Sequence, residues 1–252
     1  MPYGKKIIHN GVTISLHPAG HVLGSAQVRL EWHGEVWVVS GDYKRDPDGT
    51  CAPFEPVTCD AFITESTFGL PIYRWEAQKK FLTISATGGD VMPKRGAPSV
   101  LFCYAFGKAQ RLLNGIDSVV GPIICHGAVN ELNRIYRESG VWLPPTLSVS
   151  DVSNKGDFSK ALIIAPPSAA GSPWMRRFAD YSDGFASGWM FLRGARRRRA
   201  VDRGFVLSDH ADWPGFNADD RSDQCNACDC DPWACRYHGA VAAGKWIGCE
   251  RF

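Results

Sequence analysis

Four loops of the sequence carry side chains that can bind a metal ion or move a proton. His21 lies in HPAGHVLGSA, Asp42 in SGDYKR, Glu65 in TESTFG and His210 in LSDHADW. Imidazole nitrogens and carboxylate oxygens are ligands that Zn²⁺ and Mn²⁺ accept, and a cation held by them can activate water for hydrolysis. We therefore expect metal-dependent hydrolytic chemistry if these loops meet at one edge of a sheet.

Each of these residues has an ordinary alternative when it is taken alone. A histidine on a loop is commonly a surface or hydrogen-bonded residue, and an aspartate after a glycine commonly forms a turn. We interpret His17, four residues before His21, as structural in this way. The four residues together favour a shared site, because each lies on a loop that follows a predicted strand.

The strands that must position these loops are visible as alternating apolar and polar residues. Residues 10–45 contain such stretches, with HGE at a hairpin turn. CDAFITEST at 59–67 predicts another strand. ASGWMFLRG at 186–194 and RGFVLSDHADW at 203–213 predict two more strands that end in loops.

The middle of the chain has a different pattern, in which an apolar strand, a turn and a helix follow one another three times. The three repeats occupy residues 98–116, 121–140 and 160–178. Strands that alternate with helices predict a parallel sheet covered on both faces. Residues 81–98 and the polar, cysteine-rich tail from Asn217 fit neither pattern.

The composition is that of an ordinary globular protein. Apolar residues make up 44% and charged residues 21% of the 252 residues, and the formal net charge is +2. Bulk charge therefore does not indicate a polyanionic partner, although basic residues gather in 193–203. No stretch approaches the ~18 apolar residues of a membrane span, and the start lacks the apolar run of a signal peptide. We expect no membrane partner and a cytoplasmic location.

Long stretches of the chain resemble the ligase-associated DNA exonucleases. That family belongs to the β-CASP branch of the metallo-β-lactamase-fold nucleases, which are relatives of the messenger-RNA 3′-end processing enzymes. The resemblance covers residues 3–80 and 98–216. It rests on HPAGHVLGSAQVRLE, VVSGDYKRDPD, FITESTFGLPIYRW, SVLFCYAFGKAQRLL, APPSAAGSPWMRRF and ASGWMFLRGARRRRAVDRGFVLSDHADWPG.

The resemblance implies an α/β fold with an incomplete metallo-β-lactamase αββα core and an inserted β-CASP α/β domain. We assign residues 1–70 to the core, whose N-terminal part is missing, 71–200 to the insertion and 201–216 to the return into the core. In the family, the insertion closes over the nucleic-acid cleft. This order agrees with the succession of β, α/β and β segments predicted from the residues.

The resemblance also implies roles for the four candidate residues. His21 matches a metal-binding histidine, and Asp42 matches a carboxylate that bridges two divalent metal ions, Zn²⁺ or Mn²⁺. Glu65 and His210 match a catalytic pair in which the carboxylate orients an imidazole beside the scissile phosphate. Two cations would lower the pKa of a bridging water, and an imidazolium at His210 would neutralise charge or protonate the leaving oxygen.

Two further features suggest contacts with the phosphates of a nucleic acid. Lys108 follows Gly107 at a strand-to-helix turn, where backbone amides and the helix dipole favour an anion. The basic run in RGARRRRAVDRG would suit the DNA backbone, and its members are Arg196, Arg197, Arg198 and Arg199. A solvated lysine and a solvated basic turn are the alternatives.

Two motifs of the family are absent from the sequence. A His-x-His-x-Asp-His loop, which supplies most ligands of both metals, should precede NGVTISLHPAGH, and a VTHG-like strand end should lie near the C-terminus. With only His21 and Asp42, neither metal has the three or four ligands of a stable site. We therefore expect impaired catalysis in this form of the protein.

The tail has two interpretations. One is a small zinc module, because a CxxC pair, two further cysteines and a histidine fall within residues 225–238. The other is translation out of frame, because a one-base shift of chosen codons turns Cys228–Trp233 into VIVTHG. A two-base shift turns Ile84–Ala97 into ISDWWRRNAEAGR, an amphipathic helical pattern. We favour the second interpretation for residues 81–97 and 217–252.

Several functional hypotheses remain open. The leading one is a metal-dependent DNA exonuclease that processes DNA ends in repair with a DNA ligase. A relative that processes RNA 3′ ends and a non-catalytic nucleic-acid-binding fragment are the alternatives. A last alternative is a chain that does not fold stably, because missing strands would leave sheet edges uncovered.

Overall fold

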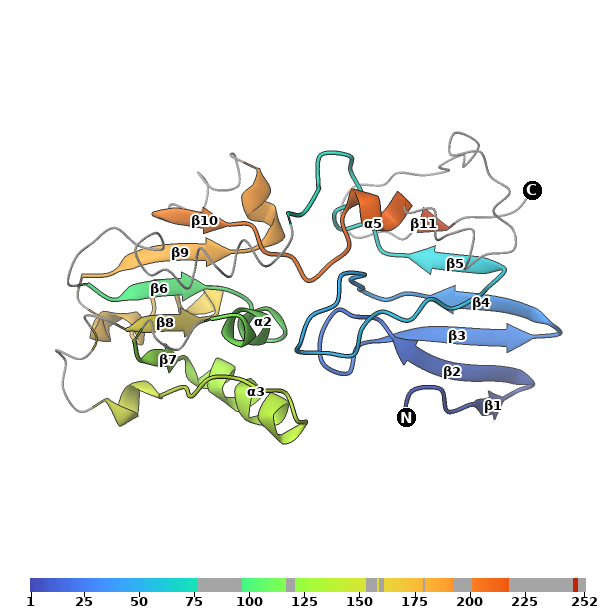
Figure 1. Ribbon diagram of the computed structural model, residues 1–252, viewed down its shortest axis with the longest axis horizontal. Coiled ribbons are helices and arrows are strands. Elements are labelled where there is room, and N and C mark those ends of the chain that lie inside the picture. The colour runs from blue at the N-terminus through green and yellow to red at the C-terminus, as the bar shows by residue number, and fades with distance from the viewer. Residues whose placement is uncertain are drawn as a thin grey trace. The chain divides into compact units, whose positions relative to one another are not determined.

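The computed structural model describes residues 1–76, 97–116, 121–152, 158, 161–178, 180–192, 201–217 and 247–248. The chain forms two compact units, Met1–Arg74 with Asp209–Phe252, and Trp75–Ser208 (Figure 1). The predictions for 81–97 and for most of 217–252 concern residues outside the described part. Among the described helices, none combines the length and the apolar character that a membrane crossing requires.

The first unit contains a six-stranded sheet in the order β1-β2-β3-β4-β5-β11. Neighbouring strands are antiparallel, except that β4 and β5 are parallel. The predicted hairpin at HGE is confirmed, since His33 and Gly34 have the positive φ angles that a tight two-residue turn requires. The strands are β1 (Ile7–His9), β2 (Val12–Pro18), β3 (Ala26–Trp32), β4 (Glu35–Val39), β5 (Ala61–Thr64) and β11 (Ile247–Gly248).

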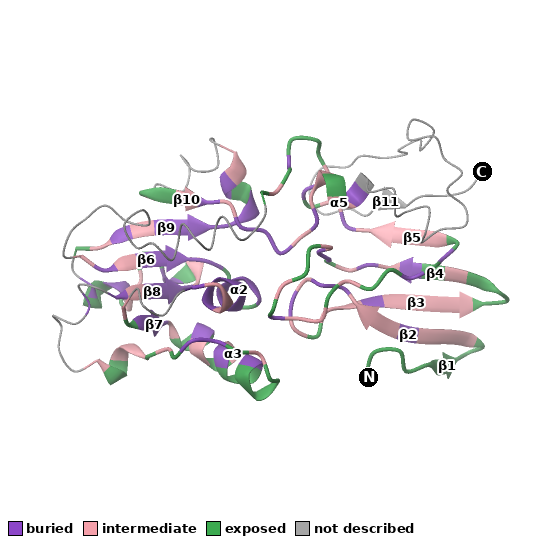
Figure 2. Cartoon of the chain, viewed as in Figure 1, coloured by how far each residue is buried: buried purple, intermediate pink, exposed green. Residues whose placement is uncertain are grey.

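Most residues of β2 to β5 are only partly buried, as Figure 2 shows. The buried residues of the first unit lie mainly in small clusters beside the loops. One cluster joins Ala19, Tyr43, Ala211 and Phe216, the last of which belongs to the short helix α5 (Trp213–Asn217). These contacts hold three of the loops that carry candidate residues.

The second unit contains a five-stranded sheet in the order β10-β9-β6-β8-β7, in which all neighbours are parallel. The predicted parallel sheet, and with it the α/β fold class, is therefore confirmed. Two α-helices, α2 (Lys108–Asn114) and α3 (Gly127–Glu138), follow two of the strands as predicted. The strands are β6 (Ser99–Phe102), β7 (Ile123–Cys125), β8 (Leu162–Ala165), β9 (Ser182–Ala186) and β10 (Arg203–Phe205).

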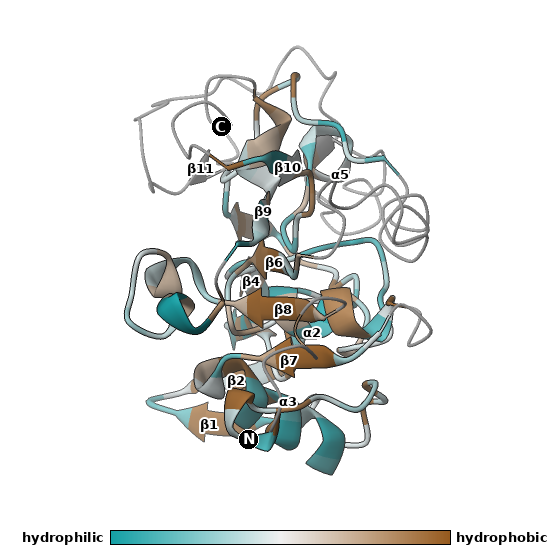
Figure 3. Ribbon diagram, turned by 90° about the vertical axis from the view of Figure 1, so that its left-hand side faces the viewer, coloured by the Kyte–Doolittle hydropathy of each residue, from teal (hydrophilic) through white to brown (hydrophobic). Residues whose placement is uncertain are grey.

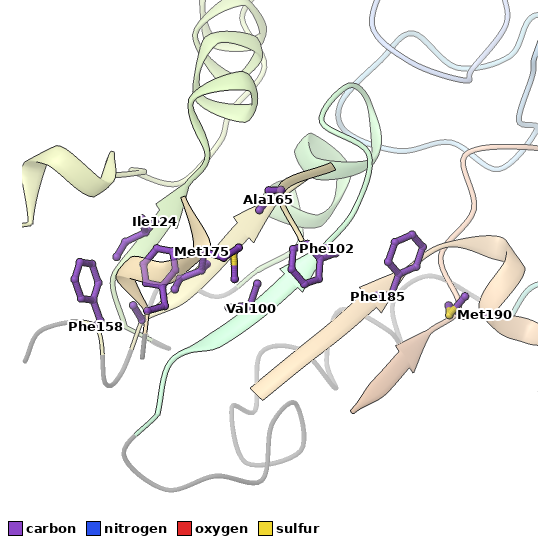
Figure 4. Close-up of a cluster of buried hydrophobic side chains, with 12 residues drawn as sticks. Val100, Phe102, Ile124, Phe158, Ala165, Met175, Phe185 and Met190 are labelled. Carbon is purple, nitrogen blue, oxygen red and sulfur yellow. The ribbon is translucent and has the colours of Figure 1, made fainter. Parts of the chain in front are cut away.

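Strands β6, β7 and β8 of this parallel sheet are apolar and largely buried. Figure 3 shows β7 and β8 in the hydrophobic colours, whereas α3 has a hydrophilic side. Figure 4 shows one face of the sheet, where Val100, Phe102, Ile124 and Phe185 contribute to a continuous apolar cluster. Burial of these side chains is the main source of stability for the second unit.

Two predictions about secondary structure are wrong. The third repeat ends in 3₁₀ turns at Pro167–Ala169 and Met175–Arg177 rather than in an α-helix, because its prolines and Gly171 interrupt helical hydrogen bonding. The strand predicted at 186–194 lies earlier, at Ser182–Ala186. Gly188–Phe191 instead forms a 3₁₀ helix that begins after Ser187, whose hydroxyl accepts a hydrogen bond from the amide of Trp189.

Candidate functional site

The four candidate residues lie in the first unit, and three of them lie on loops that follow its strands. His21 lies after β2, Asp42 after β4 and Glu65 directly after β5. His210 lies in the segment that leads into α5. The structure brings their side chains together, as the contacts below describe.

The His21 loop is fixed by its backbone. Gly20 has φ +72°, and a Cβ atom at this position would overlap the carbonyl oxygen of Lys44. The hydroxyl of Ser25 accepts hydrogen bonds from the amides of His21 and Val22, both at 3.2 Å. Glycine is therefore required immediately before His21, and the loop holds the imidazole in one place.

The contacts of the His21 ring define which nitrogen is available. Nδ1 lies 2.8 Å from the backbone carbonyl oxygen of Asp209, which can only accept a hydrogen bond. Nδ1 must therefore carry a proton, and in the neutral ring the lone pair is on Nε2. Nε2 lies 3.8 Å from Oδ2 of Asp42. Nε2 is therefore the nitrogen of His21 that is able to bind a cation, while a protein oxygen holds the other nitrogen.

Glu65 and His210 form a buried pair. Nδ1 of His210 lies 2.8 Å and 3.0 Å from the two carboxylate oxygens of Glu65, whose side chain is 4% exposed. The backbone amide of Tyr43 donates to the same carboxylate at 2.8 Å, and the carbonyl of Tyr43 accepts from the amide of Ala211 at 2.7 Å. The Tyr43 backbone thus fixes both members of the pair.

The electrostatics of this pair favour a protonated imidazole. Burial lowers the pKa of His210, but the hydrogen bond and charge of Glu65, with the charges of Asp209 and Asp42, raise it more. The net result is a pKa above the ordinary value of 6.5. An imidazolium at this position can donate a proton to a leaving oxygen.

The cluster also has the composition of a cation site. His21, Asp42 and His210 each offer one ligand atom, and these atoms lie within 4.8 Å of one another. The rings of His21 and His210 are 4.7 Å apart between centroids. Because a protonated His210 cannot bind a metal, His21 and Asp42 are the two ligands compatible with an acid role for His210. Within the described residues, His21 and Asp42 thus supply two of the three or four ligands that a stable cation site needs.

Sequence reasoning did not assign roles to Asp209 or Tyr43. Asp209 orients His21 through its carbonyl, and its buried carboxylate lies 3.9 Å from Nε2 of His210. Tyr43 acts through its backbone. The type of a residue does not reveal which groups its backbone contacts. The sequence therefore indicated Asp209 only through its position next to His210.

The other predicted residues lie elsewhere. The ring nitrogens of His17 contact Glu55 at 2.9 Å and Ser15 at 3.0 Å, which agrees with a structural role. Lys108 belongs to the second unit and is 4% exposed, with its ammonium group 4.9 Å from the ring centroid of Tyr104. A phosphate contact by Lys108 stays a prediction. Arg196–Arg199 lie outside the described residues.

The chain is similar in sequence to known proteins, although no protein-family model matches it. It is 34% identical to a probable DNA ligase of Opitutus terrae over 79% of the chain and 19% of the relative. It is 32% identical to cleavage and polyadenylation specificity factor subunit 3 of Dictyostelium discoideum, over 49% of the chain and 16% of the relative. An RNase J-like protein of Methanocaldococcus jannaschii is 25% identical, over 58% of the chain and 37% of the relative.

The chain thus spans well under half the length of each of these relatives. These relatives share one nuclease fold family. The chain belongs to the β-CASP branch of the metallo-β-lactamase-fold nucleases.

Proposed function

We propose that the protein hydrolyses phosphodiester bonds at DNA ends, as an exonuclease that works with a DNA ligase. The main observation that supports the proposal is the convergence of His21, Asp42 and His210, whose potential ligand atoms lie within 4.8 Å of one another. The buried contact between Glu65 and His210 adds a proton donor to the same cluster. The most extensive of the three similarities described above is to a probable DNA ligase, which supports the DNA assignment.

In this proposal, His21 and Asp42 would supply two of the ligands of a divalent cation, Zn²⁺ or Mn²⁺. When bound, the cation supplies Lewis acidity and lowers the pKa of a coordinated water. His210, kept protonated and aligned by Glu65, delivers a proton to the leaving oxygen. Asp209 keeps His21 in the orientation that exposes Nε2. A second cation, as predicted from the family resemblance, would need ligands beyond the described residues.

Further parts of the proposal concern organisation and location. We propose that residues 71–200 are the β-CASP insertion, which agrees with the compact unit Trp75–Ser208. We also propose a cytoplasmic location, as expected from the sequence.

RNA is the second candidate substrate. One similar protein is a cleavage and polyadenylation specificity factor subunit and another is RNase J-like, so two of the three similarities point toward RNA. The chemistry of the cluster is the same for both nucleic acids, because the cation and the imidazole act on the phosphate.

End-labelled DNA and RNA of one sequence, incubated with the purified protein and Mn²⁺ or Zn²⁺, test the proposal. Metal-dependent shortening of DNA that is lost in Asp42→Ala and retained in Asp46→Asn is the expected result. Asp46 is a suitable control because it is an exposed carboxylate paired with Lys44. Shortening of RNA alone would select the second substrate. Binding of DNA without any cleavage would favour the non-catalytic alternative.

A further inference from the structure

Two aromatic side chains of the second unit are unusually exposed for their position. Tyr104 and Phe106, just beyond the end of β6, are each 48% exposed, whereas Phe102 and Cys103 immediately before them are buried. Single exposed aromatic residues are common, but two rings that project from the end of a buried central strand require an explanation.

The topology of the sheet gives these rings a special place. From β6 the chain passes to β7 and then back to β8, and from there it crosses to β9 on the other side of β6. The chain therefore changes direction at the junction of β6 and β9. In open parallel sheets, ligands bind beyond the carboxyl ends of the strands at such a junction.

The neighbouring strand contributes a third aromatic residue at the same edge. Phe102 of β6 is paired in register with Phe185 of β9, and Figure 4 shows the two side chains on neighbouring strands. The segment after β9 carries Trp189, which is 43% exposed. Tyr104, Phe106 and Trp189 thus all lie in segments that leave the carboxyl ends of two adjacent strands.

The rings after β6 are supported by packing. The ring of Phe106 lies edge-on to the fully buried ring of Tyr136 in α3, with 6.2 Å between centroids. The ammonium group of Lys108 lies 4.9 Å from the Tyr104 ring centroid. The carbonyl of Tyr104 accepts a hydrogen bond from the amide of Ala109 at 3.1 Å. The two ring contacts restrain the side chains and the hydrogen bond restrains the backbone before any ligand binds, which reduces the entropy lost on binding.

We propose that Tyr104 and Phe106, together with Trp189, form a stacking platform for unpaired bases of a single-stranded nucleic acid. Every base has a π face, so aromatic rings bind single strands without reading their sequence. The ammonium group beside Tyr104 adds positive charge to this edge. The choice of a nucleic acid as ligand rests on the proposed function, whereas the arrangement of the rings does not.

Binding can be tested without hydrolysis. Fluorescence anisotropy of a labelled single-stranded oligonucleotide in EDTA measures affinity for the wild-type protein and for Tyr104→Ala and Phe106→Ala. Each substitution should weaken binding about tenfold, because stacking of one base is lost. Tyr104→Phe should retain wild-type affinity, since it keeps the ring. Tyr104→Leu keeps apolar volume without a ring, so it should bind as weakly as the alanine variant.

Trp142→Ala is the matched control, because Trp142 is 63% exposed in the same unit but belongs to the segment after α3 rather than to a segment that leaves β6 or β9. Its affinity should equal that of the wild-type protein. Parallel measurements with DNA and RNA strands distinguish the two sources of unpaired bases. A blunt duplex should bind without sensitivity to Tyr104→Ala, because its bases are already stacked.

Equal affinities of wild type and Tyr104→Ala for both strands, or equal weakening by Trp142→Ala, would overturn the platform. Absence of any single-strand binding would overturn it as well. Failure of the proposed hydrolysis is a separate result. If the protein binds single strands through these rings in EDTA but does not cleave them when metal is added, the stacking platform is supported and the proposed nuclease function is contradicted.

Discussion

Different interactions stabilise the two sheets of this protein. Strands β6 to β8 of the second unit are parallel and largely buried, and their apolar side chains pack into one cluster. The strands of the first unit are mostly antiparallel and half-buried, and the loops beside them are tied by hydrogen bonds from backbone groups. Apolar packing therefore determines the structure of the second unit, whereas hydrogen bonds position the candidate side chains of the first unit.

The largest expected effect concerns the polar cluster. His210→Ala removes the proton donor and should lower the rate of phosphodiester hydrolysis by about 10²–10⁴-fold. The measurement is the initial rate on end-labelled DNA at saturating Mn²⁺. His9→Ala, in the exposed strand β1, should retain the wild-type rate. An unchanged rate for His210→Ala would show that the cluster does not catalyse the reaction.

The second prediction tests the difference in packing between the two sheets. Ile163→Ala in β8 removes a fully buried side chain and should lower the free energy of unfolding by about 3 kcal/mol. Ile63→Ala in β5 removes a half-buried side chain and should lower it by about 1.5 kcal/mol. Urea denaturation measures both values. Equal losses would contradict the contrast between the two sheets.

A third prediction concerns the loop that holds His21. Gly20 and Gly24 both have positive φ, but only at Gly20 would a Cβ atom meet neighbouring backbone. Gly24→Ala should lower the free energy of unfolding by about 1 kcal/mol, the cost of left-handed backbone for alanine. Gly20→Ala should cost more than about 2 kcal/mol, because the Lys44 carbonyl must also move. The same denaturation experiment compares them, and similar costs would contradict the steric argument.

The smallest effect is the pH dependence of the buried pair. The pKa of His210 is raised in the folded state, so the stabilisation from this pair is fully present below the ordinary histidine pKa of 6.5. It is lost as the pH rises through the raised folded value. Glu65→Gln should therefore destabilise the metal-free protein more at pH 6 than at pH 9, as measured by urea denaturation in EDTA. An equal loss of stability from Glu65→Gln at both pH values would contradict the proposal that Glu65 and His210 form a charged pair.

Much of the fold could be predicted from the sequence. The hairpin at His33 and Gly34 and the parallel sheet follow from local signals, namely turn residues and continuous apolar runs. The 3₁₀ helix at Gly188–Phe191 could not be predicted from its apolar composition, because a short apolar run does not distinguish a strand from a helical turn.

The candidate site could be predicted only in part. His21, Asp42, Glu65 and His210 stand out because their types and positions after strands suggest chemistry. Tyr43 does not stand out, since its contribution is a backbone amide and carbonyl that any residue would supply. The burial of Lys108 against Tyr104 also depends on tertiary packing, which a charge at a helix start does not reveal.

Binding of Mn²⁺ to the metal-stripped protein tests the central claim most directly. Mn²⁺ prefers oxygen and nitrogen ligands over thiolates, so the cysteine-rich tail interferes little. Electron paramagnetic resonance of free Mn²⁺ measures the dissociation constant. This constant should be at least about tenfold larger for Asp42→Asn than for the wild-type protein and for Asp46→Asn, because one ligand of the cation is weakened. Equal Mn²⁺ affinity in all three proteins would contradict a cation site at His21 and Asp42.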